Sequence, residues 1–177
     1  MNLFLQQRWP NQQRIDIKMG NSASANGDLV WAVKDGSADG VRNALKEGAE
    51  INGVVDGRTA LHCAAYADLP DMVTLLLDSG ADAGTAIEGG TALHDAAERG
   101  NTRCVAILLE RGVPVDQPNT ESGHTPLMWA ALGGRTEAVK LLLEKGADRS
   151  LKNQAGKTAV DLANEYGHKE VAAALTS

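Results

Sequence analysis

The feature that most constrains this chain is a short phrase that recurs four times at nearly constant spacing. The copies are Thr59-Ala60-Leu61-His62, Thr91-Ala92-Leu93-His94, Thr125-Pro126-Leu127-Met128 and Thr158-Ala159-Val160-Asp161, and they start 32, 34 and 33 residues apart. A unit of about 33 residues cannot bury its apolar face alone, so each unit must lean on its neighbours. The chain is therefore predicted to fold as a stack of repeats.

Each unit is predicted to contain two short helices joined by a tight turn, because apolar residues fall at helical spacing twice within it. Pro70 fits the first position of a second helix, where a backbone N–H would have had no partner. A glycine follows each of the first three threonines by 21 residues, at Gly80, Gly112 and Gly146. A glycine at this place is typical of a helix end that needs a left-handed residue.

Polar connectors join the units. Each connector ends in a glycine two residues before the next threonine, at Gly57, Gly89, Gly123 and Gly156. A glycine at a repeated offset indicates a turn with positive φ. Each connector is therefore predicted to project as a hairpin-like finger.

Over residues 27–177 these motifs resemble the ankyrin repeat, with its T-P-L-H-x-A opening. The resemblance implies an all-α repeat solenoid of stacked helix-turn-helix units with projecting β-hairpin-like fingers. It also implies that Thr and His, three residues apart, fix each helix start by hydrogen bonds. Met128 and Asp161 replace this histidine, so we expect the fourth and last units to lose a bond typically worth about 1 kcal/mol.

The resemblance divides residues 27–177 into five units. The first lacks the Thr-Ala-Leu-His phrase but keeps the apolar spacing, and its extra charge suits an N-terminal cap with one face in water. The last ends without a following finger and is expected to be the C-terminal cap. The units are expected at 27–58, 59–90, 91–124, 125–157 and 158–177. Residues 30–36 of the first unit are also similar to myotrophin-type inhibitors of actin capping, which gives an alternative function.

Residues 1–26 are expected to be a leader or a disordered tail. They lack the apolar core of a secretory signal. An internal start at Met19 is an alternative, and Met19 to Ser24 matches the pattern for N-myristoylation of Gly20. In that case the chain would be a regulatory subunit that associates reversibly with membranes, because one acyl chain binds only marginally.

The sequence carries no catalytic motif of the nucleotide-binding, nucleophile-elbow or metalloprotease types, and we expect neither enzymatic activity nor a cofactor. Asp95 and Glu98 lie one helical turn apart, and we expect a solvated rim there and not an acid–base pair. His62 and Cys63 are adjacent, but no CxxC or HxxxH pair completes a metal site. Cys63 and Cys104 indicate a reduced, intracellular environment.

Recognition of another protein is the remaining function, and the ankyrin resemblance implies where it occurs. In that family partners meet the finger tips and the exposed ends of the first helices, which form a concave face. Carried onto this chain, the partner-binding positions are Val55, Asp56, Arg58, Tyr66, Ile87, Glu88, Glu98, Arg99, Glu121, His124, Trp129, Leu132, Gln154, Lys157 and Tyr166. We expect Tyr66, Trp129, Tyr166 and Trp31 to be anchors, because Tyr and Trp are enriched in binding hot spots. Alternatively, Trp31 and Trp129 cover the layer of first helices.

Charge is unevenly distributed along the chain. Residues 28–98 hold 13 acidic and four basic residues, whereas residues 99–177 hold nine acidic and ten basic ones. An acidic front half repels nucleic acid and attracts a basic protein surface. We therefore expect a monomeric adapter, scaffold or inhibitor with a protein partner that has a basic surface, and no nucleic-acid partner. The expected location is the cytoplasm, with the nucleus as an alternative.

Overall fold

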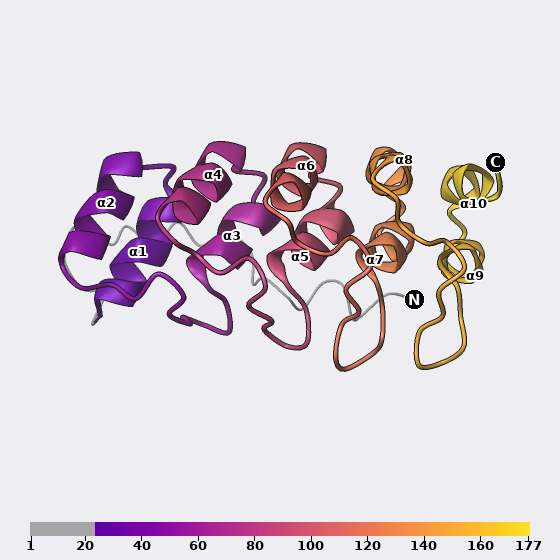
Figure 1. Cartoon of the computed structure of the whole chain (residues 1–177), viewed down its shortest axis with the longest axis horizontal. Helices are drawn as coiled ribbons and strands as arrows, with labels where there is room; N and C mark the ends of the chain where they lie inside the picture. The colour runs from indigo at the N-terminus through magenta and orange to yellow at the C-terminus, as the bar shows by residue number, and fades with distance from the viewer. Residues whose placement is uncertain (1–23) are drawn as a thin grey trace.

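The computed structural model describes residues 24–177, and this part of the chain contains ten α-helices in five consecutive pairs (Figure 1). We number the units by these pairs, from unit 1 (α1 and α2) to unit 5 (α9 and α10). The predicted all-α repeat solenoid is confirmed. The helices are α1 Ala25–Lys34, α2 Ala38–Lys46, α3 Ala60–Tyr66, α4 Pro70–Asp78, α5 Ala92–Arg99, α6 Thr102–Glu110, α7 Pro126–Leu132, α8 Thr136–Glu144, α9 Ala159–Glu165 and α10 Lys169–Thr176.

The helices form two layers, with the odd-numbered helices in one and the even-numbered helices in the other (Figure 1). Within the odd layer each helix packs against the next, from α1 to α9. The connectors between units project beyond the odd layer, so that this layer lies between the connectors and the even layer (Figure 1). We call the connectors finger 1 (49–58), finger 2 (81–90), finger 3 (113–124) and finger 4 (147–157).

Short polar side chains fix the start of each odd helix. The hydroxyl groups of Thr59, Thr125 and Thr158 each accept a hydrogen bond from the backbone N–H three residues later. Such N-caps satisfy a donor that the helix itself cannot. In unit 1 Ser24 takes this role, and α1 begins at Ala25, two residues before the expected start of the unit.

Glycines end the second helices as predicted. Gly80, Gly112 and Gly146 have φ values of 93°, 87° and 91°. This left-handed region is costly for residues with a Cβ, and glycine enters it freely. At the other end of α4, Pro70 occupies the first helical turn, where its missing N–H is tolerated.

Histidines at the third position of α3 and α5 form the expected bonds with threonine. His62 Nδ1 lies 2.7 Å from Thr59 Oγ1, and its Nε2 lies 3.2 Å from the carbonyl oxygen of Gly90 in finger 2. His94 Nδ1 accepts a hydrogen bond from the backbone N–H of Thr91 at 3.0 Å. The ring of His62 therefore ties its own helix start to the next unit.

The expectation that Asp161 loses this bond is wrong. Its carboxylate accepts hydrogen bonds from the backbone N–H of Thr158 at 2.9 Å and from the Thr158 hydroxyl at 2.7 Å. Aspartate is short, but its oxygen reaches the position that a histidine nitrogen occupies in the other units. Unlike the ring of His62, the Asp161 side chain forms no bond to another unit among the described residues. Met128 has no ring nitrogen and is buried, with 1% of its surface exposed.

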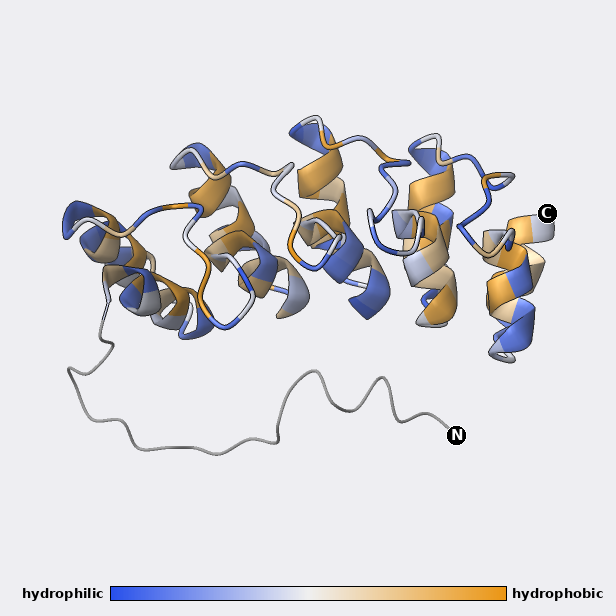
Figure 2. Cartoon of the chain, turned by 90° about the horizontal axis from the view of Figure 1, so that it is seen from below, coloured by the Kyte–Doolittle hydropathy of each residue, from blue (hydrophilic) through white to orange (hydrophobic). Residues whose placement is uncertain are grey.

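One continuous hydrophobic core runs through the array between the layers. Small residues such as Ala64, Ala96 and Ala130 are fully buried and let neighbouring odd helices approach closely. Leucines of the even helices, such as Leu76 and Leu108, are fully buried in the same core. Hydrophobic residues are concentrated on the helices, and the connecting loops are mostly hydrophilic (Figure 2).

Polar side chains also join successive units where the odd helices end. Asn101 donates to the carbonyl oxygens of Ala65 and Tyr66 at 2.8 and 3.1 Å. Arg135 Nε donates to the Glu98 carbonyl at 3.0 Å. His168 Nε2 lies 3.0 Å from the Leu132 carbonyl oxygen. These bonds satisfy helix-end carbonyl groups that have no partner within their own helix.

Candidate protein-binding surface

The finger tips and the exposed sides of the odd helices form one surface, which we call the inner-helix face. It consists of α1, α3, α5, α7 and α9 with fingers 1 to 4. All the predicted partner-binding residues are at least partly exposed. Trp31 and Tyr166 are the most open of the expected aromatic anchors, with 61% and 49% of their surface exposed. The repeat register places Trp31 level with Cys63, Asp95 and Trp129.

The tips of fingers 1 and 2 are tight turns that present acidic side chains. Isolated bridges join Val55 to Arg58 and Ile87 to Gly90. Between them Asp56 has a φ of 50° and the following glycine one of 74°, which is the pattern of a type I′ hairpin turn. Glu88 has a φ of 47° in finger 2. This conformation is uncommon for a residue with a long side chain.

Backbone hydrogen bonds join fingers 2, 3 and 4 into a row. Thr120 N–H donates to the carbonyl of Gly89 at 2.9 Å, and Gln154 N–H donates to the carbonyl of Ser122 at 3.1 Å. Asn119, which is 5% exposed, accepts from two backbone N–H groups of its own finger and donates to the Glu88 carbonyl at 3.3 Å. The tips therefore hold a fixed spacing along the array.

A cluster of charged and aromatic side chains crosses units 2 and 3. Arg58 Nη2 lies 3.5 Å from Asp95 Oδ1, and these side chains are only 13% and 11% exposed. The guanidinium groups of Arg58 and Arg99 lie 4.3 and 4.7 Å from the centre of the Tyr66 ring. A cation over an aromatic ring is stabilising by about 0.5 to 2 kcal/mol, depending on exposure. The structure thus brings together Arg58, Tyr66 and Arg99, which the sequence had placed on the binding face.

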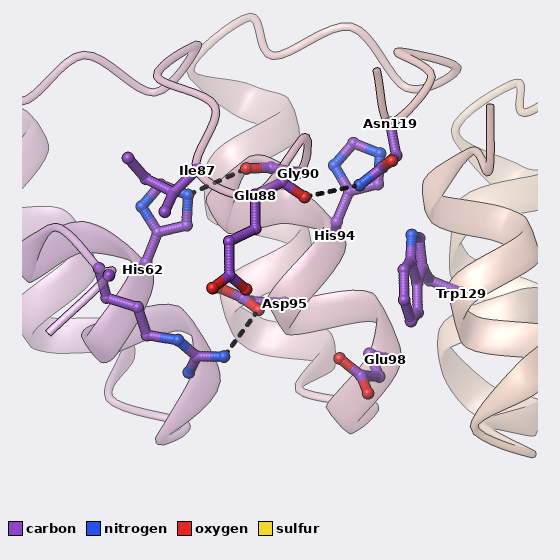
Figure 3. Close-up of a pocket in the computed structure, with 11 residues that line it drawn as sticks. His62, Ile87, Glu88, Gly90, His94, Asp95, Glu98, Asn119 and Trp129 are labelled. Atoms are coloured by element: carbon purple, nitrogen blue, oxygen red, sulfur yellow. Dashed lines mark hydrogen bonds and ion pairs between the residues drawn. The ribbon is translucent and has the colours of Figure 1, made fainter. Parts of the chain in front are cut away.

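Asp95 was expected on a solvated rim, and for this residue the expectation is wrong. It is only 8% exposed and lies beside Arg58. Its neighbour Glu98 is partly exposed and faces the space toward Trp129 (Figure 3).

A small cavity lies between finger 2, α5 and α7 (Figure 3). Its volume of about 20 Å³ suits a single water molecule. Asp95, Glu98, Asn119 and Trp129 are among its lining residues.

Trp129 Nε1 is buried and has no hydrogen-bond partner among the described residues. The ring of Trp129 also lies 5.6 Å from that of His124, tilted by 47°. Trp129 therefore covers the helix layer and keeps part of its surface exposed on the inner-helix face.

His94 also lines this cavity. Its Nδ1 accepts from the Thr91 N–H, so the neutral ring carries its proton on Nε2. Burial lowers the pKa of His94 to about 4, and the carbonyl groups of Gln117 and His124 partly oppose this shift. Neither carbonyl forms a hydrogen bond of regular geometry with Nε2. Burial lowers the pKa of His62 as well. At neutral pH both rings are therefore uncharged.

The predicted residues of units 4 and 5 are more scattered. Leu132 is partly buried at the end of α7, and Gln154 is exposed on finger 4. Lys157 of finger 4 forms an ion pair with Glu165 of α9. Tyr166 follows α9, three helices along the odd layer from Tyr66 (Figure 1). The structure does not unite these residues with the cluster in units 2 and 3.

The described part of the chain holds neither a candidate metal site nor a thiol with a lowered pKa. No group of three or more His, Cys, Asp or Glu side chains between residues 24 and 177 could hold a metal ion. Burial raises the pKa of the Cys63 thiol, and burial with nearby Asp68 raises that of Cys104 to about 12. Both thiols are therefore protonated at neutral pH and poor nucleophiles. None of the described helices is both long and apolar enough to span a membrane.

A family model described as ankyrin repeats (3 copies) matches residues 29–119 and again residues 93–177. The two matches together cover most of the chain and all five helix pairs. No curated protein matches the sequence. The similarity of residues 30–36 to myotrophin therefore has no support beyond those residues.

Proposed function

The chain belongs to the ankyrin-repeat family, and from this premise we propose that it binds a partner protein on its inner-helix face without catalysing a reaction. Ankyrin repeats are in general protein–protein interaction modules. The observation that carries the proposal is the cluster of Arg58, Tyr66, Asp95 and Arg99. These side chains come from two units and a finger, and they hold one another in place before any partner arrives.

Preorganisation favours binding because these side chains then lose less conformational entropy when a partner docks. Tyr66 is partly exposed at the centre of the cluster, and Trp129 lies two units further along the face, on α7. Tyr and Arg side chains are common among residues that dominate binding energy. We propose that Tyr66, Arg99 and Trp129 anchor the partner and that the finger tips surround this contact.

The finger side of the face is acidic, which supports a partner with a basic surface there. Asp56, Glu88 and Glu121 are exposed on fingers 1 to 3, and Glu98 is partly exposed on α5. Opposite charges speed association and fix orientation more than they add affinity. We expect the affinity of the complex to fall as the salt concentration rises, because exposed charges are screened.

The test starts by recovering partners from the cell of origin on the immobilised chain and identifying them by mass spectrometry. The dissociation constant of the identified partner is then measured by calorimetry for the unchanged chain and for Tyr66→Ala. We expect a loss of about 2 kcal/mol, or roughly thirtyfold in affinity. The matched control is Arg103→Ala, an exposed residue of α6 outside this face. Equal affinities for Tyr66→Ala and the control, with both variants folded, would contradict the proposed surface.

The proposal includes a monomeric adapter or inhibitor in the cytoplasm. Sedimentation of the isolated chain tests this, because concentration-dependent self-association would favour an assembly scaffold. Gly20 lies outside the described residues, and lipid attachment there stays a prediction. The intact mass of the protein from its native cell checks it, since a chain that begins at Met1 rules out acylation of Gly20.

A further inference from the structure

A second region of the inner-helix face lies where α1, α3 and α5 end, away from the finger tips. An open groove of about 440 Å³ runs across these helix ends. We call it the basic groove. Its lining includes Lys34, Cys63, Tyr66, Asp68, Arg99 and Arg135.

The charge of the basic groove opposes that of the surrounding chain. Lys34, Arg99 and Arg135 come from three different units, and Asp68 is the only acidic residue among the lining side chains. The chain as a whole has a formal net charge of −6. A concentration of positive charge against this background is not a consequence of composition.

Helix dipoles account for part of this charge. Lys34 and Arg99 stand in the last turns of α1 and α5, where cations are favourable. Arg135 does not fit this explanation, because it is the N-cap of α8, where a cation is unfavourable. Its Nε bond to the Glu98 carbonyl does not require a permanent charge either, because Asn101 and His168 make the equivalent bonds in neighbouring units.

The arginines of the groove are oriented in advance. The Arg99 guanidinium lies over the Tyr66 ring at 4.7 Å, and within residues 24–177 it forms no hydrogen bond or ion pair. Stacking on a ring face leaves the N–H groups at the edge of the guanidinium available for a carboxylate. The single hydrogen bond of the Arg135 side chain in the same range uses Nε, and its two terminal nitrogens form none. Planar guanidinium groups bind carboxylates in a bidentate manner.

We propose that the basic groove binds an acidic segment of the partner protein, with its carboxylates on Arg99 and Arg135. This inference rests on the proposed function and adds the orientation of the bound segment. The finger tips carry Asp56, Glu88 and Glu121, whereas the helix ends carry the arginines. A bound segment therefore crosses the face with its basic residues at the fingers and its acidic residues in the groove.

The test uses two peptide probes, octaglutamate and octalysine, titrated into the isotope-labelled full chain and followed by NMR. We expect octaglutamate to shift the signals of Tyr66, Arg99 and Asn101, and octalysine to shift those of Glu88 and Glu121. Both effects should weaken as salt is added. Octaglutamate shifts confined to other surfaces would overturn the inference. So would an octathymidylate that moves the groove signals as strongly, because the groove would then select phosphates over carboxylates.

Two substitutions make the test specific. Arg99→Gln removes one charge, and Arg135→Asn removes the other while keeping a side chain that makes the same inter-unit bond at Asn101. We expect the double variant to bind octaglutamate about tenfold more weakly than the unchanged chain, since charge-assisted hydrogen bonds are lost. Arg103→Gln, outside the groove, should leave the dissociation constant unchanged. Thermal unfolding confirms that the variants are folded.

An unchanged dissociation constant for the folded double variant would show that the groove is not the site. The proposed function can survive that result. If the identified partner still loses affinity with Tyr66→Ala while octaglutamate ignores the groove, only the assignment of an acidic segment is wrong.

Discussion

The first helices of units 3 and 5 are capped in the same way, but the side chains that follow the cap make different contacts in the two units. In unit 3, His94 is buried next to finger 3, and the adjacent Asp95 pairs with Arg58 of finger 1. In unit 5, Asp161 is exposed, and within residues 24–177 its hydrogen bonds are to Thr158 of its own helix start. Local capping is therefore common to both helix starts, and at these two positions a side-chain ion pair with another unit's finger occurs in unit 3 and not in unit 5. Polar side chains of the interior units shape the inner-helix face because they bridge units.

The largest expected effect compares the hydrophobic core of an interior unit with that of the last unit. Leu108 of α6 and Leu175 of α10 occupy equivalent positions and are 0% and 3% exposed. Helix α6 packs between α4 and α8, whereas α10 packs on α8 and α9 at the end of the described array. We expect Leu108→Ala to lower the free energy of unfolding by about 4 kcal/mol, because its neighbours on both sides leave a cavity that cannot collapse.

For Leu175→Ala we expect a loss of about 2 kcal/mol, since the last helix can shift into the space. Urea unfolding monitored by circular dichroism gives both values. The m-value should stay constant, so that midpoints compare directly. Equal losses for the two variants would mean that the end unit is packed as rigidly as the interior.

The second prediction uses pH to separate the two units. Burial lowers the pKa of His94 to about 4, against about 6.5 in an unfolded chain. Between these values the unfolded state binds more protons, so the contribution is complete above pH 6.5 and is lost as pH falls to 4. The full loss is about 3 kcal/mol by linkage. Denaturant midpoints recorded at intervals from pH 7 to 4 measure it.

The matched variants are His94→Gln and Asp161→Asn. The first removes the titrating ring, so the slope between pH 6.5 and 4 should fall, and His62 and His124, whose pKa values burial also lowers, account for part of what remains. The second should leave that slope intact. A hydrogen bond from Thr158 lowers the pKa of Asp161 below its ordinary value, so its contribution is lost only at still lower pH. An unchanged slope in His94→Gln would show that another group carries the acid sensitivity.

Much of the fold could be predicted from the sequence because it depends on local rules. The threonine caps, the left-handed glycines and Pro70 each act within a few residues of their own position. The proximity of Tyr66 and Arg99 was also accessible, because 33 residues separate them and this is one repeat period. The geometry of the side chains could not be predicted. No sequence pattern indicates that two guanidinium groups lie against the Tyr66 ring.

Two residues show why some side-chain contacts escaped prediction. Asp95 was expected to be solvated because aspartate is usually exposed. Its burial depends on Arg58, 37 residues earlier, whose side chain crosses from finger 1 to α5. Asp161 was expected to lose a bond because it differs from histidine, although its carboxylate accepts from the same threonine. Whether two different side chains can form the same hydrogen bond depends on distances that the sequence does not contain.

The junctions on either side of unit 3 also differ, at the base of the fingers. In finger 1, Asn52 Oδ1 accepts a hydrogen bond from the backbone N–H of Asp82 in finger 2 at 2.9 Å. The equivalent pair in fingers 2 and 3 is Gly84 and Pro114, which offer neither acceptor nor donor. At the next junction the bond returns, because the carboxylate of Asp116 accepts the N–H of Asp148 at 3.1 Å.

The smallest expected effect restores this missing bond. Pro114→Asp supplies the N–H and Gly84→Asn supplies the acceptor, and both residues occur at equivalent positions of the chain. A Cβ at Gly84 would meet Asp82 Oδ1 at 3.3 Å, which a small movement of that side chain accommodates. Alone, Pro114→Asp should cost about 0.5 kcal/mol, because proline restricts the unfolded chain. Together the two changes should show a favourable coupling of about 1 kcal/mol in a double-mutant cycle of unfolding free energies. Simple additivity of the two single effects would mean that the bases of fingers 2 and 3 do not reach each other, and that these fingers are joined only nearer their tips, where Thr120 N–H donates to the Gly89 carbonyl and Asn119 to the Glu88 carbonyl.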